Sequence, residues 1–80
     1  MALPNSAQIR AARALLGWSQ PKVSAMAGVA VNTLSRFESG RRPLTDRTLR
    51  DIERVFEENG ISFARNGRTV VVSLLQAEEE

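Results

Sequence analysis

Residues 20–40 read QPKVSAMAGVAVNTLSRFESG, and this stretch predicts two short helices joined by a tight turn. Ser19 is a favourable N-cap, and Pro21 is tolerated in the first turn of the helix that follows it. Gly28 ends that helix after eight residues, and a second helix is expected over residues 31–39. Two helices that follow each other this closely must cross steeply, with small or aliphatic residues at their contact.

The second of these helices has one apolar face and one polar face. Leu34 and Phe37 point inward in the predicted helix, so Asn32, Thr33 and Arg36 lie on its outer face. Asn32 and Arg36 are four residues apart and are therefore neighbours. Asparagine suits adenine and arginine suits guanine in a major groove about 12 Å wide. The pattern favours a helix-turn-helix that reads base edges, although any amphipathic helix also has a polar face.

Two longer helices flank this pair. Asn5 and Gln8 form a relaxed capping box for a helix that ends at Gly17, and Thr45 caps a helix that ends at Asn59-Gly60. The expected core positions recur at helical spacing. They are Ile9, Ala12, Leu15 and Leu16 in the first helix and Leu49, Ile52, Val55 and Phe56 in the last, with Trp18 and Met26 as further core residues.

The end of the chain changes to a period of two around Asn66-Gly67, the strongest two-residue hairpin signal. A turn closed there predicts that Phe63 pairs with Val70 and Ile61 with Val72. Ser73 and the two leucines after it then have no partner. The second strand is apolar on both faces, an aggregation liability unless it is paired. We predict that it pairs with its counterpart in a second subunit, through Val70, Val71, Val72, Leu74 and Leu75; the alternative is a flap over one end of the bundle.

The composition excludes most catalytic chemistry. The 80 residues include no cysteine and no histidine, so thiolate catalysis, Cys-ligated zinc and an unperturbed group that titrates near neutral pH are all missing. No enzyme, no metal site, no cofactor and no small-molecule ligand are expected. The apolar runs are far shorter than a membrane span of about 20 residues. We expect no signal peptide, because the N-terminus lacks a continuous apolar stretch. We expect a protein of the cytoplasm that does not bind membranes.

The net charge of +2 conceals an uneven distribution. Residues 1–54 contain nine basic and four acidic side chains, whereas residues 55–80 contain two basic and five acidic ones. Ten of the eleven basic residues are arginine, whose planar donors suit phosphates and guanine. A polyanion is therefore the expected partner of the first two thirds of the chain.

The segments LGWSQ (16–20), MAGV (26–29) and LSRFESGRRP (34–43) closely resemble the Xre/Cro family, the lambda-repressor-like helix-turn-helix domains of bacterial and phage regulators. The resemblance covers residues 9–61. It implies a mainly α fold, a four-helix bundle that binds double-stranded operator DNA, usually as a homodimer on a palindrome. It also implies an association with the bacterial or phage nucleoid.

The resemblance assigns roles position by position. Gln20 matches a glutamine that contacts the DNA backbone, and Arg36 matches a base-reading position. Arg13 and Glu38 match a structural ion pair. The remaining matches are Val31, Asn32 and Thr33 at the head of the recognition helix, and Arg41 and Arg42 in a loop that approaches phosphate.

Three features depart from the family pattern. Ala30 stands where the recognition helix commonly has a Ser or Thr cap, and Lys22 replaces a frequent acidic residue, which adds a positive charge near the expected phosphate face. The usual fifth helix is replaced by the hairpin. The expected organisation is thus a DNA-binding domain over residues 1–60, a dimerisation hairpin over 61–75 and an acidic tail over 76–80.

Two further functions share these features. The first is an antitoxin or other protein-interaction module that also binds its own promoter, with the hairpin or the acidic tail neutralising a protein partner. The second is a controller of a restriction–modification system, which would use the same DNA chemistry. A transcriptional repressor that binds through residues 31–39 is the principal expectation.

Overall fold

Four helices and a hairpin follow one another in the computed structural model of the chain, which describes residues 2–76. The two strands of the hairpin are antiparallel and are the last elements in the chain. The mainly α fold predicted from the sequence, four helices and then a hairpin, is confirmed. The acidic tail expected at residues 76–80 lies outside the described residues except for Gln76. The elements are α1 (Ser6–Leu16), α2 (Gln20–Ala27), α3 (Val31–Glu38), α4 (Asp46–Glu57), β1 (Ile61–Asn66) and β2 (Thr69–Leu74).

Side-chain caps and a glycine set the helix ends. The Asn5 side chain accepts from the Gln8 N–H at 2.9 Å, and Gln8 Oε1 accepts from the Asn5 N–H at 3.0 Å, which completes the capping box at the start of α1. Ser19 and Thr45 each accept from a backbone N–H three residues later at 3.2 Å. Gly28 ends α2 with a φ of 71°, in the left-handed region that favours glycine.

The core lies between the four helices and one end of the hairpin. Trp18 stacks on Phe56 with ring centroids 5.7 Å apart, and Phe63 of β1 meets Phe56 edge-on at 6.0 Å. Leu15 and Met26, two of the residues predicted in the core, are each 46% exposed. That prediction was wrong because each lies at the edge of the buried arc of its helix. The buried apolar residues are Ile9, Ala12, Val23, Leu34, Phe37, Leu49, Ile52, Val55, Phe56 and Ile61.

The register of the hairpin differs from the predicted one by two residues. Phe63 pairs with Val72 and Ile61 with Leu74, so Ser73 and Leu74 both have partners in β1. The turn is centred on Gly67-Arg68, not on Asn66-Gly67. Gly67 has a φ of 59° and no non-glycine residue in the described chain has a positive φ, which fits a type II′ turn with glycine first. A shift of two keeps every side chain on its predicted face.

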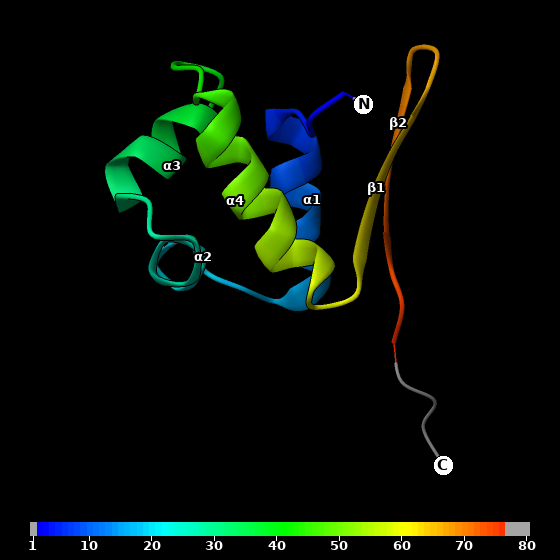
Figure 1. The fold of residues 1–80 in the computed structure, drawn as a ribbon, viewed down its shortest axis with the longest axis horizontal. Helices are drawn as coiled ribbons and strands as arrows, with labels where there is room; N and C mark the ends of the chain where they lie inside the picture. The colour runs from blue at the N-terminus through cyan, green and yellow to red at the C-terminus, as the bar shows by residue number, and fades with distance from the viewer. Residues whose placement is uncertain (1, 77–80) are drawn as a thin grey trace.

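The hairpin is fastened to the start of α1 by Gln8, whose side chain is almost fully buried. Gln8 Nε2 donates to the carbonyl of Ala64 in β1 at 3.0 Å and to that of Val71 in β2 at 3.2 Å. The inner face of the hairpin therefore lies against α1 and α4. All four helices lie on this one side of the hairpin, and α3 lies at the far end of the bundle from it (Figure 1).

Candidate nucleic-acid interface

The α2–α3 turn is tight because two successive backbone donors share one acceptor. The N–H groups of Gly28 and Val29 donate to the Ser24 carbonyl at 3.0 and 3.1 Å. Val23 and Leu34 are fully buried on the facing sides of the two helices. These contacts fix the crossing of α2 and α3 in the helix-turn-helix arrangement predicted from the sequence.

The two faces of α3 differ sharply in burial. Leu34 and Phe37 are buried, whereas Val31, Asn32 and Arg36 are exposed and Thr33 is half-buried. The structure thus brings the sequence-predicted reading residues together on one accessible strip of α3. Ala30 precedes the helix with extended backbone angles and provides no side-chain cap, so the first turn of α3 lacks the capping hydrogen bond found in α1, α2 and α4.

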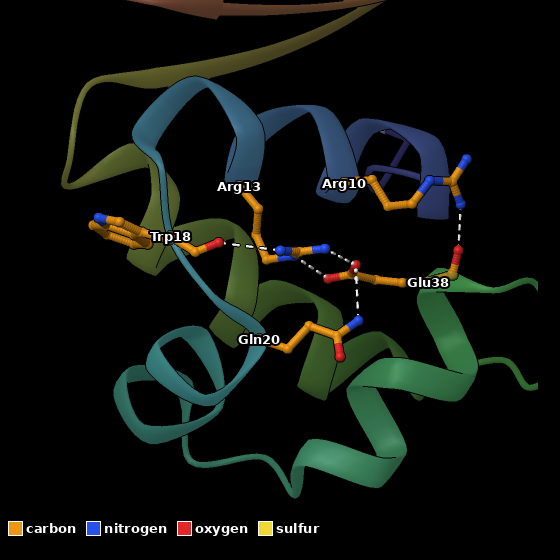
Figure 2. A network of polar contacts seen from close by, with 5 residues as sticks. All are labelled: Arg10, Arg13, Trp18, Gln20 and Glu38. Carbon is orange, nitrogen blue, oxygen red and sulfur yellow. Dashed lines mark hydrogen bonds and ion pairs between the residues drawn. The ribbon is translucent and has the colours of Figure 1, made fainter.

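Beneath this strip, the carboxylate of Glu38 is bound by Arg13 in a two-point ion pair (Figure 2). Arg13 Nε lies 2.8 Å from Oε2, and Arg13 Nη2 lies 2.6 Å from Oε1. Arg13 Nη1 also donates to the Trp18 carbonyl at 3.1 Å. The hydrogen bonds to Glu38 raise the pKa of the Arg13 guanidinium, against the lowering effect of partial burial. The pair joins α1 to the end of α3.

Two further side chains complete this network around Glu38. Gln20 Nε2 donates to Glu38 Oε1 at 3.2 Å, and Arg10 Nη1 donates to the Glu38 backbone carbonyl (Figure 2). Arg10 thereby places a positive charge at the C-terminal end of α3, where the helix dipole is negative. Gln20, predicted to contact the DNA backbone, has its amide nitrogen turned inward. The network links the first three helices and holds α3 against the bundle.

The predicted phosphate-contacting cations lie on the elements before and after α3. Lys22 is exposed, and its ammonium lies 5.0 Å from the centre of the Trp18 ring. Arg41 and Arg42 are exposed in the loop after α3, and their backbone N–H groups donate to the Arg36 carbonyl at 2.9 and 3.3 Å. This hydrogen bonding ties the loop to α3.

The residues predicted to form the dimer interface lie elsewhere. Val70 and Val71 are 38% and 42% exposed on β2, and Leu75 is 85% exposed just after it. Val72 and Leu74 are half-buried because their side chains pack inward against the core. The structure does not bring these residues near α3.

Sequence reasoning missed the roles of Arg10 and Gln8. Arg10 precedes Arg13 by three residues and therefore shares a helix face with it, a spacing that could have indicated the contact with Glu38. Gln8 was recognised only as a cap. Its contacts with residues 64 and 71 span more than half the chain, and no local pattern signals them.

Two other kinds of site find no support in the part of the chain that the structure describes. Within residues 2–76 no three potential metal ligands come together. Over the same residues no helix combines the length and the hydropathy that crossing a bilayer requires.

A short helix ending at a glycine, a tight turn and a second helix with an exposed polar strip define a helix-turn-helix protein. The sequence matches the helix-turn-helix family HTH_3 over residues 9–61, and the chain belongs to this family, the Xre or lambda-repressor-like group. It is therefore a DNA-binding helix-turn-helix regulator. A comparison with curated proteins finds no significant match.

Proposed function

We propose that the protein is a sequence-specific transcriptional repressor that binds a palindromic operator as a homodimer through residues 31–39. The observation that carries this proposal is the exposed pair Asn32 and Arg36 on a helix whose far end is held by the Glu38 network. A reading helix must keep its side chains in one geometry while they contact base edges, and the network provides that rigidity.

The residues on the strip have distinct roles in this proposal. Arg36 donates two hydrogen bonds to a guanine. Asn32, which lies about one turn of α3 before Arg36, pairs with an adenine. The methyl groups of Val31 and Thr33 pack on thymine. Lys22, Arg41 and Arg42 contact phosphates and fix the position of the protein without selecting a sequence. Gln20 contributes at the DNA backbone from the start of α2, oriented by its bond to Glu38.

Repression follows from occupancy, since a dimer on the operator blocks promoter access. The two copies of α3 read half-sites about 34 Å apart on one face of the duplex. The hairpin residues Val70, Val71, Val72, Leu74 and Leu75 supply the dimer contacts, and the acidic tail from residue 76 onward takes no part in DNA binding. The protein acts in the cytoplasm on the nucleoid of a bacterium or on phage DNA.

Selection of bound fragments from a random DNA pool, followed by measurement of stoichiometry, tests this function. We expect an enriched palindrome whose half-sites are about 10 base pairs apart, centre to centre, with two chains on each duplex. Retention of the pool without any enriched sequence would contradict base readout. One chain on a non-palindromic site would contradict the dimer.

A second candidate, an antitoxin that also binds its own promoter, is favoured by the exposed apolar residues of the hairpin. Leu75 is 85% exposed, and together with Val71 it offers apolar area on the face of the hairpin that points away from the helices. If a toxin covers this surface, co-expression with the product of a neighbouring reading frame yields a complex of fixed stoichiometry. The antitoxin role is contradicted if the chain, under the same conditions, associates with itself and with no product of the neighbouring reading frame.

A further inference from the structure

The dipeptide Asn-Gly occurs twice in the chain, at residues 59–60 and 66–67. The backbone nitrogen that follows an asparagine can attack the side-chain amide of that asparagine and close a five-membered ring. Glycine in the second position has no Cβ to hinder this attack and leaves the backbone free to adopt the required angles. Asparagine is accordingly one of the thermolabile residues of proteins. The structure places the two copies of the dipeptide in different environments.

The first copy is held by hydrogen bonds just after α4. Asn59 Nδ2 donates to the Val55 carbonyl at 2.8 Å, and the Gly60 N–H donates to the Glu57 carbonyl at 3.2 Å. The nitrogen that would leave and the nitrogen that would attack are therefore both engaged. The surroundings are also close, since a Cβ at Gly60 would lie 2.8 Å from the Leu75 carbonyl oxygen. These contacts protect the first copy from ring closure.

The second copy lies at the tip of the hairpin and lacks such contacts. Asn66 and Gly67 are both exposed, and within residues 2–76 neither the Asn66 side chain nor the Gly67 N–H makes a hydrogen bond. Gly67 follows the closing pair of the ladder, Asn66 with Thr69, as the first residue of the turn. A Cβ on Gly67 would meet no atom of a non-neighbouring residue within 4 Å. Both reacting groups are therefore accessible to each other and to water.

We propose that Asn66 is a self-modification site, at which the Gly67 nitrogen attacks the Asn66 side-chain amide. The nitrogen loses its proton to water and forms a bond to Asn66 Cγ. The bond between Cγ and Nδ2 then breaks, and Nδ2 takes up a proton from water and leaves as ammonia. Water adds to one of the two carbonyl carbons of the ring and reopens it. The products are aspartate and isoaspartate at position 66, and the overall change consumes one water and releases one ammonia.

The reaction proceeds through opening of the hairpin tip alone. Ring closure needs the side chain and the next backbone nitrogen to come together, which the extended backbone of the Asn66–Thr69 pair does not allow while that pair is closed. Gln8 holds the hairpin at Ala64 and Val71, two positions inside the closing pair on each strand. Local opening costs least where few contacts hold the chain, so the tip opens while the helices stay folded.

Modification changes both the charge and the backbone of the tip. Asn66 lies between Arg65 and Arg68, and either product replaces its neutral amide with a carboxylate. Isoaspartate also adds one atom to the backbone path, which displaces the closing pair with Thr69 because the ladder requires matched lengths on the two strands. Old chains therefore differ from newly made ones at the hairpin tip, independently of DNA binding.

Incubation of the folded full chain at neutral and at mildly alkaline pH tests the proposal. Peptide mapping by mass spectrometry detects the replacement of NH2 by OH at each position. We expect position 66 to be modified about tenfold faster than position 59 or more, because only the tip opens without wider unfolding. The rate should rise with pH, since the attacking nitrogen must lose its proton.

An unstructured peptide of residues 57–69 is the reference, because it contains both dipeptides without the fold and should be modified at similar rates at the two positions. Equal rates at positions 59 and 66 in the folded chain overturn the proposal. So does an unmodified position 66 in the folded chain after the peptide has reacted completely.

A matched pair of variants assigns the reaction to Asn66. Asn66→Gln keeps an exposed amide but lengthens the side chain, so the five-membered ring cannot form and modification at the tip should cease. Asn59→Gln makes the same change at the protected position and should leave the rate at Asn66 unaltered. Continued release of ammonia from the tip of Asn66→Gln overturns the assignment.

A third variant separates the effect of charge from that of the backbone. Asn66→Asp introduces the carboxylate without the additional backbone atom. The Thr69 amide should exchange hydrogen faster in the isoaspartate fraction of the aged native chain than in Asn66→Asp. Equal exchange in the two proteins would contradict the displacement of the closing pair.

Discussion

Arg13 and Glu38, 25 residues apart in the chain, meet through two parallel hydrogen bonds of 2.6 and 2.8 Å. Only 3% of the Glu38 side chain is exposed, against 22% for Arg13. The carboxylate is therefore the group that most needs its partners, and its side-chain donors are Arg13 and Gln20. The pair joins α1 to the end of α3.

Removing one side of this pair should destabilise the fold strongly. Arg13→Ala leaves a buried carboxylate with only Gln20 as a side-chain donor, and we expect a loss of about 3 kcal/mol in the free energy of unfolding, measured by urea denaturation. Asp51→Ala, which breaks an exposed ion pair with Arg54 on α4, is the control and should change stability by less than about 1 kcal/mol. Equal losses in the two variants would contradict a special role for the Glu38 site.

Arg36 and Arg41 should affect DNA binding in different ways. Arg36→Ala is expected to weaken binding to the selected operator by about 1–3 kcal/mol and to relax discrimination at one base pair. Arg41→Ala should weaken binding to operator and random DNA alike, and it should lower the slope of log affinity against log salt concentration by about 1. Titrations on both DNAs over a series of salt concentrations check this. A uniform loss in Arg36→Ala would argue against base readout.

Gln8 should stabilise the protein beyond its role as a cap. Gln8→Ala removes the bonds to Ala64 and Val71 together with one half of the capping box, whereas Asn5→Ala removes the cap alone. We expect a loss of about 2–3 kcal/mol for Gln8→Ala and about 1 kcal/mol for Asn5→Ala in thermal or urea unfolding. A loss no larger than that of Asn5→Ala would show that the contacts with the hairpin carry little energy.

Gly60 is required by both its backbone angle and its surroundings. Its φ is 94°, and a Cβ at this position would lie 2.8 Å from the Leu75 carbonyl oxygen. Gly60→Ala should therefore destabilise the protein by about 1–3 kcal/mol. Gly67→Ala is the matched control, because Gly67 also has a positive φ but a Cβ there would meet nothing within 4 Å. Melting temperatures should fall further for Gly60→Ala; the opposite order would contradict the close approach.

Glu53 should make stability depend on pH. Desolvation by burial, followed by the neighbouring charge of Glu57, raises the pKa of Glu53 in the folded protein, against the lowering effect of Arg50. A carboxyl group with a raised folded pKa favours folding at low pH and loses that contribution as the pH rises through the folded pKa. Glu53→Gln should therefore gain about 0.2–0.5 kcal/mol at about pH 7 and little below about pH 4.

Urea denaturation at the two pH values measures this difference. Glu58→Gln, at the exposed C-terminal end of α4, provides the control. A gain for Glu53→Gln that is the same at both pH values would show that ionisation is not its cause.

Local signals were sufficient to predict the helices. Asn5, Ser19 and Thr45 are caps in the structure as in the sequence, and the helix boundaries follow from them within one or two residues. The exposed strip of α3 also followed from spacing, since Leu34 and Phe37 define the buried side. These features depend on residues a few positions apart in the chain, so the sequence alone is sufficient to predict them.

Contacts between segments that are distant in the sequence were harder to predict. The hairpin register was misjudged because Asn66-Gly67 was placed at both central positions of the turn, whereas Gly67 occupies the first and Arg68 the second. The inward turn of Gln20 toward Glu38 depends on how α2 and α3 cross, which side-chain spacing in either helix does not define. Such contacts arise from packing and need the three-dimensional arrangement.

One helix of 11 residues, α1, contacts both the hairpin and the end of α3. Gln8 at its start binds the hairpin, and Arg10 and Arg13 further along bind the end of α3. If two copies join through their hairpins, the distance and the rotation between the two reading helices are set by this short rigid element. One inserted base pair between half-sites rotates them by about 35° relative to each other. The affinity of the protein for its operator would then depend on the spacing between the half-sites as strongly as on their base sequence.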